Sequence, residues 1–213
     1  MGRPLSVEAS TPPMTPRGSA SRMGYVEMPV VPLNGRPMIS YVLKALLESE
    51  KIDRIYIVLS PKVPETSRHI CEVYHGHDRI IPLVTSGTGY VEDTVEAVKM
   101  LKLFRPFLIV SSDIPLITPS AIDHIVTEYE KCGKESLSVR VDAAKAIDYG
   151  IRSDIILKDT GTDTIPSGIN IIDGSHMYRA QDEHVLVVDD PALAVNVNYT
   201  KDLDFCSRLI DVR

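Results

Sequence analysis

The sequence alternates between short β-branched runs and longer stretches whose apolar residues recur at helical spacing. The pattern predicts helices over 38–47, 65–74, 91–101 and 119–131, and strands over 54–59, 80–84 and 107–110. Such an order is typical of βα units that form a mainly parallel sheet, because each helix returns the chain to the same end of the sheet. It predicts an α/β fold with a mostly parallel sheet.

The two ends of the chain follow this alternation less closely. After Gly133 the apolar pattern predicts strands over 137–141, 165–172, 185–188 and 194–198, and a closing helix over 200–210. The first 22 residues contain four prolines with scattered Ser and Thr, so no strand is assigned there. We therefore expect an irregular or disordered segment over 1–20 and a single domain over 21–213.

Charge and cysteine content restrict the partners and the compartment. The formal net charge of -6 provides no basic field, which argues against nucleic acid or an anionic membrane as the main partner. An anionic substrate must then be held by local groups. The three cysteines lie far apart without metal-ligand spacing, and no apolar run reaches the length of a membrane span. A cytoplasmic location is expected.

Asp113 is the strongest single candidate for chemistry. It follows the most apolar run of the chain, 107–110, and precedes Pro115. Ligands of open α/β sheets bind outside the carboxyl ends of the strands, so Asp113 is placed to hold Mg²⁺ against phosphate oxygens. The alternative is an aspartate that only caps the turn or the next helix.

A second candidate is the segment 85–90, Thr-Ser-Gly-Thr-Gly-Tyr, between a strand and a helix. Its glycines permit close approach of a ligand, and free N–H groups at the helix start can bind an anion or a base edge. The alternative is an ordinary loop.

Two further segments carry polar residues at strand ends. Gly168 lies inside a strand-like run, where glycine often marks a bulge or a close ligand approach. Asn196 and Asn198 precede the last helix, so their amides can bind a ligand or metal, or can cap that helix.

Taken in order, these segments resemble those of the MobA-like nucleotidyltransferases, and among them the archaeal GTP:adenosylcobinamide-phosphate guanylyltransferases, the CobY family. The residues that carry the resemblance are Arg22-Met23-Gly24, the segments 33–39, 85–87 and 89–93, Val110-Ser111-Ser112-Asp113, Pro166-Ser167-Gly168-Ile169-Asn170 and Asn196-Val197-Asn198. The Gly-Arg-Pro-Met-Ile and Asn-x-Asn motifs occur across the superfamily, whereas the segments 85–93 and 167–170 point to the cobinamide branch.

The resemblance implies a Rossmann-like, three-layer, mostly parallel sheet of the nucleotidyltransferase type. It implies transfer of GMP from GTP to adenosylcobinamide phosphate, with release of pyrophosphate, in cobalamin biosynthesis. By similarity, Gly18 and Arg22 face the triphosphate, Thr85, Ser86 and Gly87 face the guanine, Gly168 lies at the sugar side and Asn196 binds the nucleotide. Arg22 and Asp113 are the catalytic residues, and Asp113 with Asn198 holds Mg²⁺. The resemblance leaves a homodimer open.

The N-terminal part departs from the family pattern. Members have Ala-Gly-Gly-x-Gly-x-Arg-Met-Gly after an apolar first strand, whereas this chain retains only Gly18 of the three glycines. Met28 stands where a lysine is expected. A frame-shifted N-terminus would explain the departure, and so would a divergent, weakly active or inactive homologue. A molybdenum-cofactor or sugar-1-phosphate nucleotidyltransferase also stays open as the function.

Overall fold

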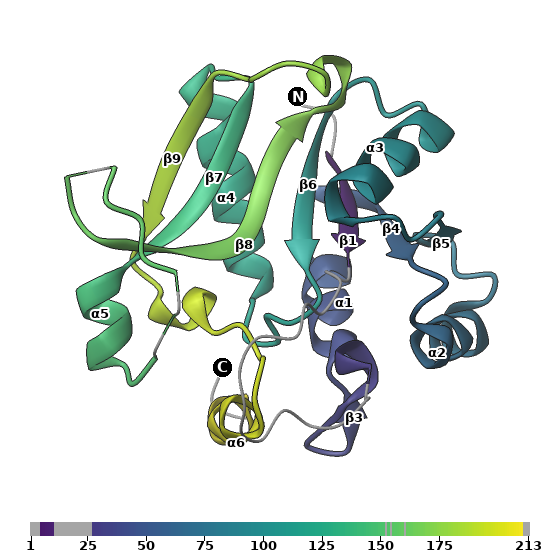
Figure 1. Ribbon diagram of the computed structural model, residues 1–213, viewed down its shortest axis with the longest axis horizontal. Helices are drawn as coiled ribbons and strands as arrows, with labels where there is room; N and C mark the ends of the chain where they lie inside the picture. The colour runs from purple at the N-terminus through teal and green to yellow at the C-terminus, as the bar shows by residue number, and fades with distance from the viewer. Residues whose placement is uncertain (1–4, 11–26, 152, 154, 160, 211–213) are drawn as a thin grey trace.

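A seven-stranded sheet organises the chain, in the order β5-β4-β1-β6-β8-β7-β9 (Figure 1). The computed structural model describes residues 5–10, 27–151, 153, 155–159 and 161–210, with backbone alone for 5–10. The strands are β1 Leu5–Ser10, β4 Ile52–Leu59, β5 Ile80–Val84, β6 Pro106–Ser111, β7 Ser136–Asp142, β8 Thr164–Asp173 and β9 Glu183–Val188. A separate hairpin consists of β2 Pro32–Leu33 and β3 Arg36–Pro37.

The sheet is parallel except for one strand. β1 pairs in parallel with both β4 and β6, whereas β8 runs antiparallel to β6 and β7. From β1 the chain adds β4 and β5 on one side, and then crosses to β6 on the other side. The strand order therefore reverses between β1 and β6, where open α/β sheets bind their ligands. The predicted mostly parallel α/β fold is confirmed.

The first strand corrects the expectation of an irregular N-terminus. Six residues, Leu5–Ser10, form β1 between β4 and β6, although the sequence pattern assigns no strand to them. Their alternation of Ser, Glu and apolar residues hides the strand, because central parallel strands usually consist of continuous apolar runs. The other residues of the 1–20 segment lie outside the described part of the chain, and the single domain over 21–213 stays a prediction.

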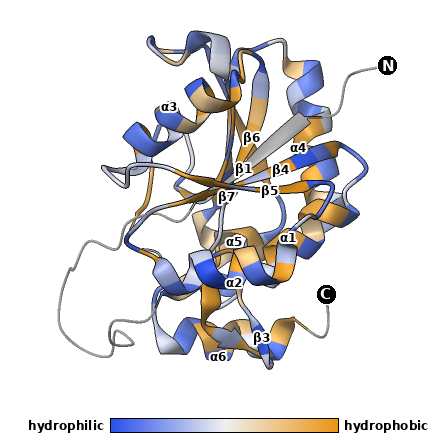
Figure 2. Cartoon of the chain, turned by 90° about the vertical axis from the view of Figure 1, so that its right-hand side faces the viewer, coloured by the Kyte–Doolittle hydropathy of each residue, from blue (hydrophilic) through white to orange (hydrophobic). Residues whose placement is uncertain are grey.

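Helices cover the sheet in two layers. The helices are α1 Ile39–Glu48, α2 Pro64–Tyr74, α3 Tyr90–Leu101, α4 Pro119–Cys132, α5 Ala143–Asp148 and α6 Thr200–Leu209, with 3-10 turns η1 Met28–Val30, η2 Gly174–His176 and η3 Pro191–Ala194. In Figure 2, α3 lies on one side of the sheet and α1 and α4 lie on the other. This arrangement gives the three layers expected from the resemblance. No described helix is long and apolar enough to cross a membrane.

The alternation of side chains along the strands produces the two cores. Ile55, Ile57 and Leu59 of β4 join the larger cluster, which includes residues of α1 and α4. Tyr56 of β4 faces the opposite way and packs in a smaller cluster that contains Val98 of α3. Successive strand residues point to opposite faces, so a strand covered on both sides needs apolar residues throughout.

Two connections differ from the sequence prediction. The stretch 194–198 is not a strand: η3 ends at Ala194, and the following residues make no ladder. The short helix α5 has only six residues, too few for its helical period to be recognised in the sequence. In the β2–β3 hairpin, Asn34 and Gly35 both have positive φ, as this tight turn requires.

Candidate active site

Asp113 lies at the carboxyl end of β6, at the point where the strand order reverses. Ser111 Oγ donates a hydrogen bond to Asp113 Oδ1 at 2.5 Å. Burial raises the pKa of this carboxyl group, and the bond from Ser111 partly opposes that shift. Asp113 does not cap the next helix, because Thr118 Oγ1 accepts from Ala121 N at the start of α4. A helix-capping role for Asp113 is therefore wrong.

Three chain segments converge beside Asp113. Gly168 of β8 has φ +79°, and a Cβ at this position would lie 3.2 Å from Ser111 Cβ and 3.4 Å from Asn196 Oδ1. Val197 N donates to Asp113 O at 2.8 Å, which ties the segment after η3 to the end of β6. The structure therefore brings together three of the predicted site residues, Asp113, Gly168 and Asn196. Ser111 was missed as a partner because its contact with Gly168 depends on the pairing of β6 with β8.

Asn198 lies at the margin of this cluster and is exposed. Its Nδ2 donates to Asn196 O at 3.4 Å, and its backbone N–H donates to Asp202 Oδ2 at 3.0 Å. Tyr199, not Asn198, is the N-cap of α6. A capping role is therefore wrong for this side chain, while its role as a metal ligand stays a prediction.

The loop 85–89 is folded back onto the start of α3. Thr85 is buried, and its N–H donates to Leu59 O at 3.0 Å. Gly87 N donates to Asp93 Oδ1 at 2.9 Å, and Ser86 N donates to Glu96 Oε2 at 3.0 Å. The Ser86 contacts lower the pKa of Glu96. Two carboxylates of α3 thus hold the loop in place.

These contacts correct one expectation about the loop. The N–H groups of Ser86, Gly87 and Thr88 are not free for an anion, since Asp93 and Glu96 accept their hydrogen bonds. With these N–H groups occupied, the loop is better suited to accept hydrogen bonds from a base than to donate them to a phosphate. Contact of Thr85, Ser86 and Gly87 with guanine stays a prediction.

The glycine-loop residues, Gly18 and Arg22, lie outside the described residues. β1 ends at this same edge, because Ser10 is paired with Ser111 at the end of β6. Met28 lies in η1, half-buried, and packs against the larger core. It provides an apolar contact where the resemblance expects a cation.

The site suits Mg²⁺ better than a metal held by protein side chains alone. Within the described residues, no three His, Cys, Asp or Glu side chains form a group that could hold a metal. Mg²⁺ is usually bound by one or two carboxylates together with substrate phosphates and water. Asp113, partly buried and without a cationic partner among the described side chains, fits that role. The metal itself stays a prediction.

A separate hollow of about 370 Å³ lies between η1, β3 and α2. Its lining includes Val30, Pro37, Arg68 and His69, and none of the predicted site residues. It is therefore distinct from the cluster around Asp113.

Comparisons with known proteins agree with this fold. The family model described as "MobA-like NTP transferase domain" matches residues 18–149. A solved hypothetical transferase from Thermus thermophilus has a TM-score of 0.69 at 15% identity and covers 95% of this chain and 100% of its own. A solved 4-diphosphocytidyl-2C-methyl-D-erythritol synthase also has a TM-score of 0.69, at 10% identity, over 99% of this chain and 100% of its own. The two structures support the fold alone.

Sequence relatives narrow the class. An adenosylcobinamide-phosphate guanylyltransferase from Methanocaldococcus jannaschii is 34% identical over 91% of this chain and 93% of its own length. A probable molybdenum cofactor guanylyltransferase from Thermococcus kodakarensis is 29% identical, over 48% of this chain and 45% of its own length. The family model and the Methanocaldococcus jannaschii relative define a nucleotidyltransferase. The chain belongs to the MobA-like NTP transferase family and, within it, to the branch of the adenosylcobinamide-phosphate guanylyltransferases.

Proposed function

We propose that this chain transfers GMP from GTP to adenosylcobinamide phosphate and releases pyrophosphate. The observation that carries the proposal is the 34% identity to the Methanocaldococcus jannaschii relative over 91% of the chain. The convergence of Asp113, Gly168 and Asn196 at the reversal of strand order supports it, because this is where such sheets bind nucleotides. The reaction belongs to cobamide synthesis.

The chemistry requires positioning more than a protein nucleophile. A phosphate oxygen of the acceptor attacks the α-phosphorus of GTP in line, and the bond from that phosphorus to the pyrophosphate oxygen breaks. Asp113 and Asn198 would hold Mg²⁺, which neutralises charge on the phosphate oxygens when bound. Gly168 leaves space between Ser111 and Asn196, so a ligand can approach the backbone closely. Fixed groups that oppose developing charge account for most of the rate in such sites.

Base selection is assigned to the loop 85–89. The N–H groups of Ser86, Gly87 and Thr88 are occupied by Asp93 and Glu96, so the loop would act toward the base as an acceptor through its oxygen atoms. Guanine presents two neighbouring donors, N1–H and N2–H, whereas adenine presents an acceptor at N1. A site that accepts from the base therefore leaves groups unpaired with adenine.

The proposal is tested with two measurements on the unchanged chain. Calorimetry with Mg²⁺ should give a lower Kd for GTP than for ATP. Pyrophosphate release should require adenosylcobinamide phosphate, with a reaction lacking acceptor as the control. Equal Kd values would contradict guanine selection. Pyrophosphate release with a molybdenum-cofactor precursor or a sugar 1-phosphate instead would place the chain in another branch of the family. GTP binding without pyrophosphate release would favour an inactive homologue.

A further inference from the structure

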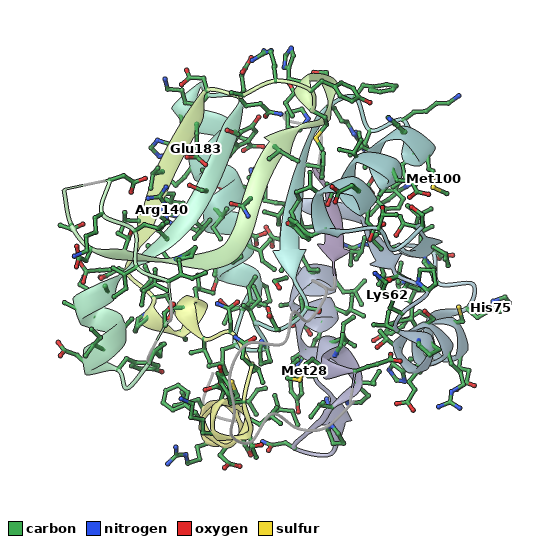
Figure 3. All side chains as sticks on the ribbon, viewed as in Figure 1. Met28, Lys62, His75, Met100, Arg140 and Glu183 are labelled. Carbon is green, nitrogen blue, oxygen red and sulfur yellow. The ribbon has the colours of Figure 1, made fainter. Side chains whose placement is uncertain are left out.

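A tight turn follows β4 at the carboxyl edge of the sheet. Val63 N donates to Ser60 O at 3.1 Å, and Lys62 N donates to Ser60 Oγ at 3.2 Å. These two bonds fix the backbone of the turn and leave the Lys62 side chain exposed at its tip. Figure 3 places Lys62 beside the end of β4, between that strand and α2.

The turn is packed directly against the loop 85–89. A Cβ at Gly87 would lie 2.6 Å from Ser60 Oγ and 2.9 Å from Pro61 Cδ, and φ of Gly87 is +69°. Glycine is required there both for the backbone conformation and for the close contact. A ligand held by the loop therefore has the 60–63 turn as its neighbour, within the reach of a lysine side chain.

The charges around this point are mainly negative. Asp93 and Glu96 face the loop, Glu92 lies over Gly89, and Asp113 ends the strand two places along the sheet. A triphosphate that enters this edge would meet carboxylates with no compensating charge from Met28, which is packed against the core. In addition to Arg22 and the proposed Mg²⁺, a cation from another element would reduce this repulsion.

Lys62 is the lysine available for that purpose. Most described lysines have a partner: Lys44, Lys51, Lys131, Lys134, Lys145 and Lys158 pair with carboxylates, and Lys99 and Lys201 lie over tyrosine rings. In the described part of the chain, only the ammonium groups of Lys62 and Lys102 make no such contact. Lys102 follows α3 and precedes β6, so it lies at the opposite edge of the sheet.

We propose that the ammonium group of Lys62 binds the phosphates of the nucleotide, supplying the positive charge that Met28 does not. This inference rests on the proposed function, since it takes GTP as the ligand. An ammonium on a flexible stem contacts phosphate as a point charge, so the interaction grows with the number of phosphates and weakens with salt. The turn adjoins the loop assigned to the guanine, so the proposed contact requires the ammonium group to reach past the base to the phosphates.

Lys62→Met is compared with Lys102→Met, which removes the same charge from an exposed site at the far edge. Calorimetry with Mg²⁺ should show that Lys62→Met raises the Kd of GTP about tenfold, the effect of losing one charged hydrogen bond. The Kd of GMP should change much less, and Lys102→Met should change neither. Lys62→Arg keeps the charge and should retain most of the affinity. Unchanged thermal unfolding midpoints would show that all variants are folded.

The possible results distinguish a failure of the Lys62 assignment from a failure of the proposed guanylyl transfer. If Lys62→Met and Lys102→Met bind GTP equally well, Lys62 is not at the phosphates. Equal losses for GTP and GMP would also overturn the inference, since they would place Lys62 at the base or the sugar. Failure of the unchanged chain to bind GTP would count against the proposed function itself, and the inference would fall with it.

Discussion

At the scale of single residues, Asp113 combines a proposed binding role with a cost in stability. Its carboxyl group is desolvated at the end of β6, and this raises its pKa above the ordinary value for aspartate. A raised pKa means that the folded state binds a proton more readily than the unfolded state. The stability of the folded chain therefore falls as pH rises from the unfolded pKa through the folded pKa. A bound metal cation would offset this effect at neutral pH.

We expect Asp113→Asn to separate the two roles. At pH 7, without metal or nucleotide, the variant should unfold at a higher temperature, because it removes a desolvated charge and keeps an acceptor for Ser111 Oγ. The difference should shrink as pH falls through the raised pKa of the folded state and should vanish below about pH 4, where the aspartate is protonated in both states. Metal-dependent turnover should fall by about 10²-fold or more. Full turnover at saturating GTP and Mg²⁺ would contradict the assignment.

Gly168 allows a test of close packing in the site. Gly168→Ala places a Cβ at positive φ and against Ser111 and Asn196. Gly133→Ala is the matched control, because Gly133 has φ +68° and nothing within 4 Å of its ideal Cβ. Both should lose about 1–2 kcal/mol of unfolding free energy in urea denaturation from backbone strain. Gly168→Ala should lose more unfolding free energy than Gly133→Ala, and it alone should weaken GTP binding. If the two variants have the same unfolding free energy and the same Kd for GTP, Gly168 is not closely packed in the site.

At the scale of elements, α3 and the loop before it act as one unit. Asp93 Oδ1 accepts from Gly87 N at 2.9 Å and from Thr88 N at 3.3 Å. Asp93→Ala should release this loop and raise the Kd of GTP about tenfold with a smaller change for ATP, since the loop would no longer be pre-organised. Glu92→Ala removes a charge from the same helical turn but no hydrogen bond to the loop. Calorimetry that gives the two variants the same ratio of GTP to ATP affinity would refute a specific role for Asp93.

The elements also show which parts of the structure the sequence could predict. Strands β5 and β6 and helices α2 and α4 agree with their predicted ranges within one or two residues, because each has a clear apolar period and Gly or Pro near its ends. The direction of β8 was not predictable, since the side-chain pattern of a strand is the same in parallel and antiparallel pairing. The stretch 194–198 was misread as a strand because its buried Ala194, Val195 and Val197 give it the apolar pattern of a strand without strand pairing.

The candidate site was partly predictable for similar reasons. The position of Asp113 could be predicted because the end of a buried strand is recognisable in the sequence and lies at the edge where such sheets bind ligands. Its contacts were not, because Ser111 and Gly168 meet through the pairing of β6 with β8, and Asn196 is held beside them by the hydrogen bond from Val197 N to Asp113 O. The roles of Asp93 and Glu96 were hidden as well, since they depend on the positive φ of Gly87 turning the loop back toward α3.

At the scale of the whole molecule, the site depends on a strand that the sequence did not reveal. β1 is hydrogen-bonded to β4 along one edge and to β6 along the other. Without it, both neighbours would present unpaired N–H and C=O groups to a gap in the centre of the sheet. The two halves of the site, the loop 85–89 beside β4 and Asp113 after β6, would lose the strand that separates and positions them.

We therefore expect a chain that begins at residue 11 to lose cooperative folding, whereas a chain that begins at residue 5 should behave like the full chain. Each buried backbone group left unpaired costs about 1–3 kcal/mol, and six strand residues contribute several such groups. Their sum is comparable to the whole stability of a domain, about 5–15 kcal/mol. Circular dichroism during thermal unfolding measures the transition, and calorimetry with GTP measures the site. A cooperative transition at an unchanged temperature in the shorter chain would mean that β4 and β6 can form the sheet without β1, and would remove this strand from the account of the site.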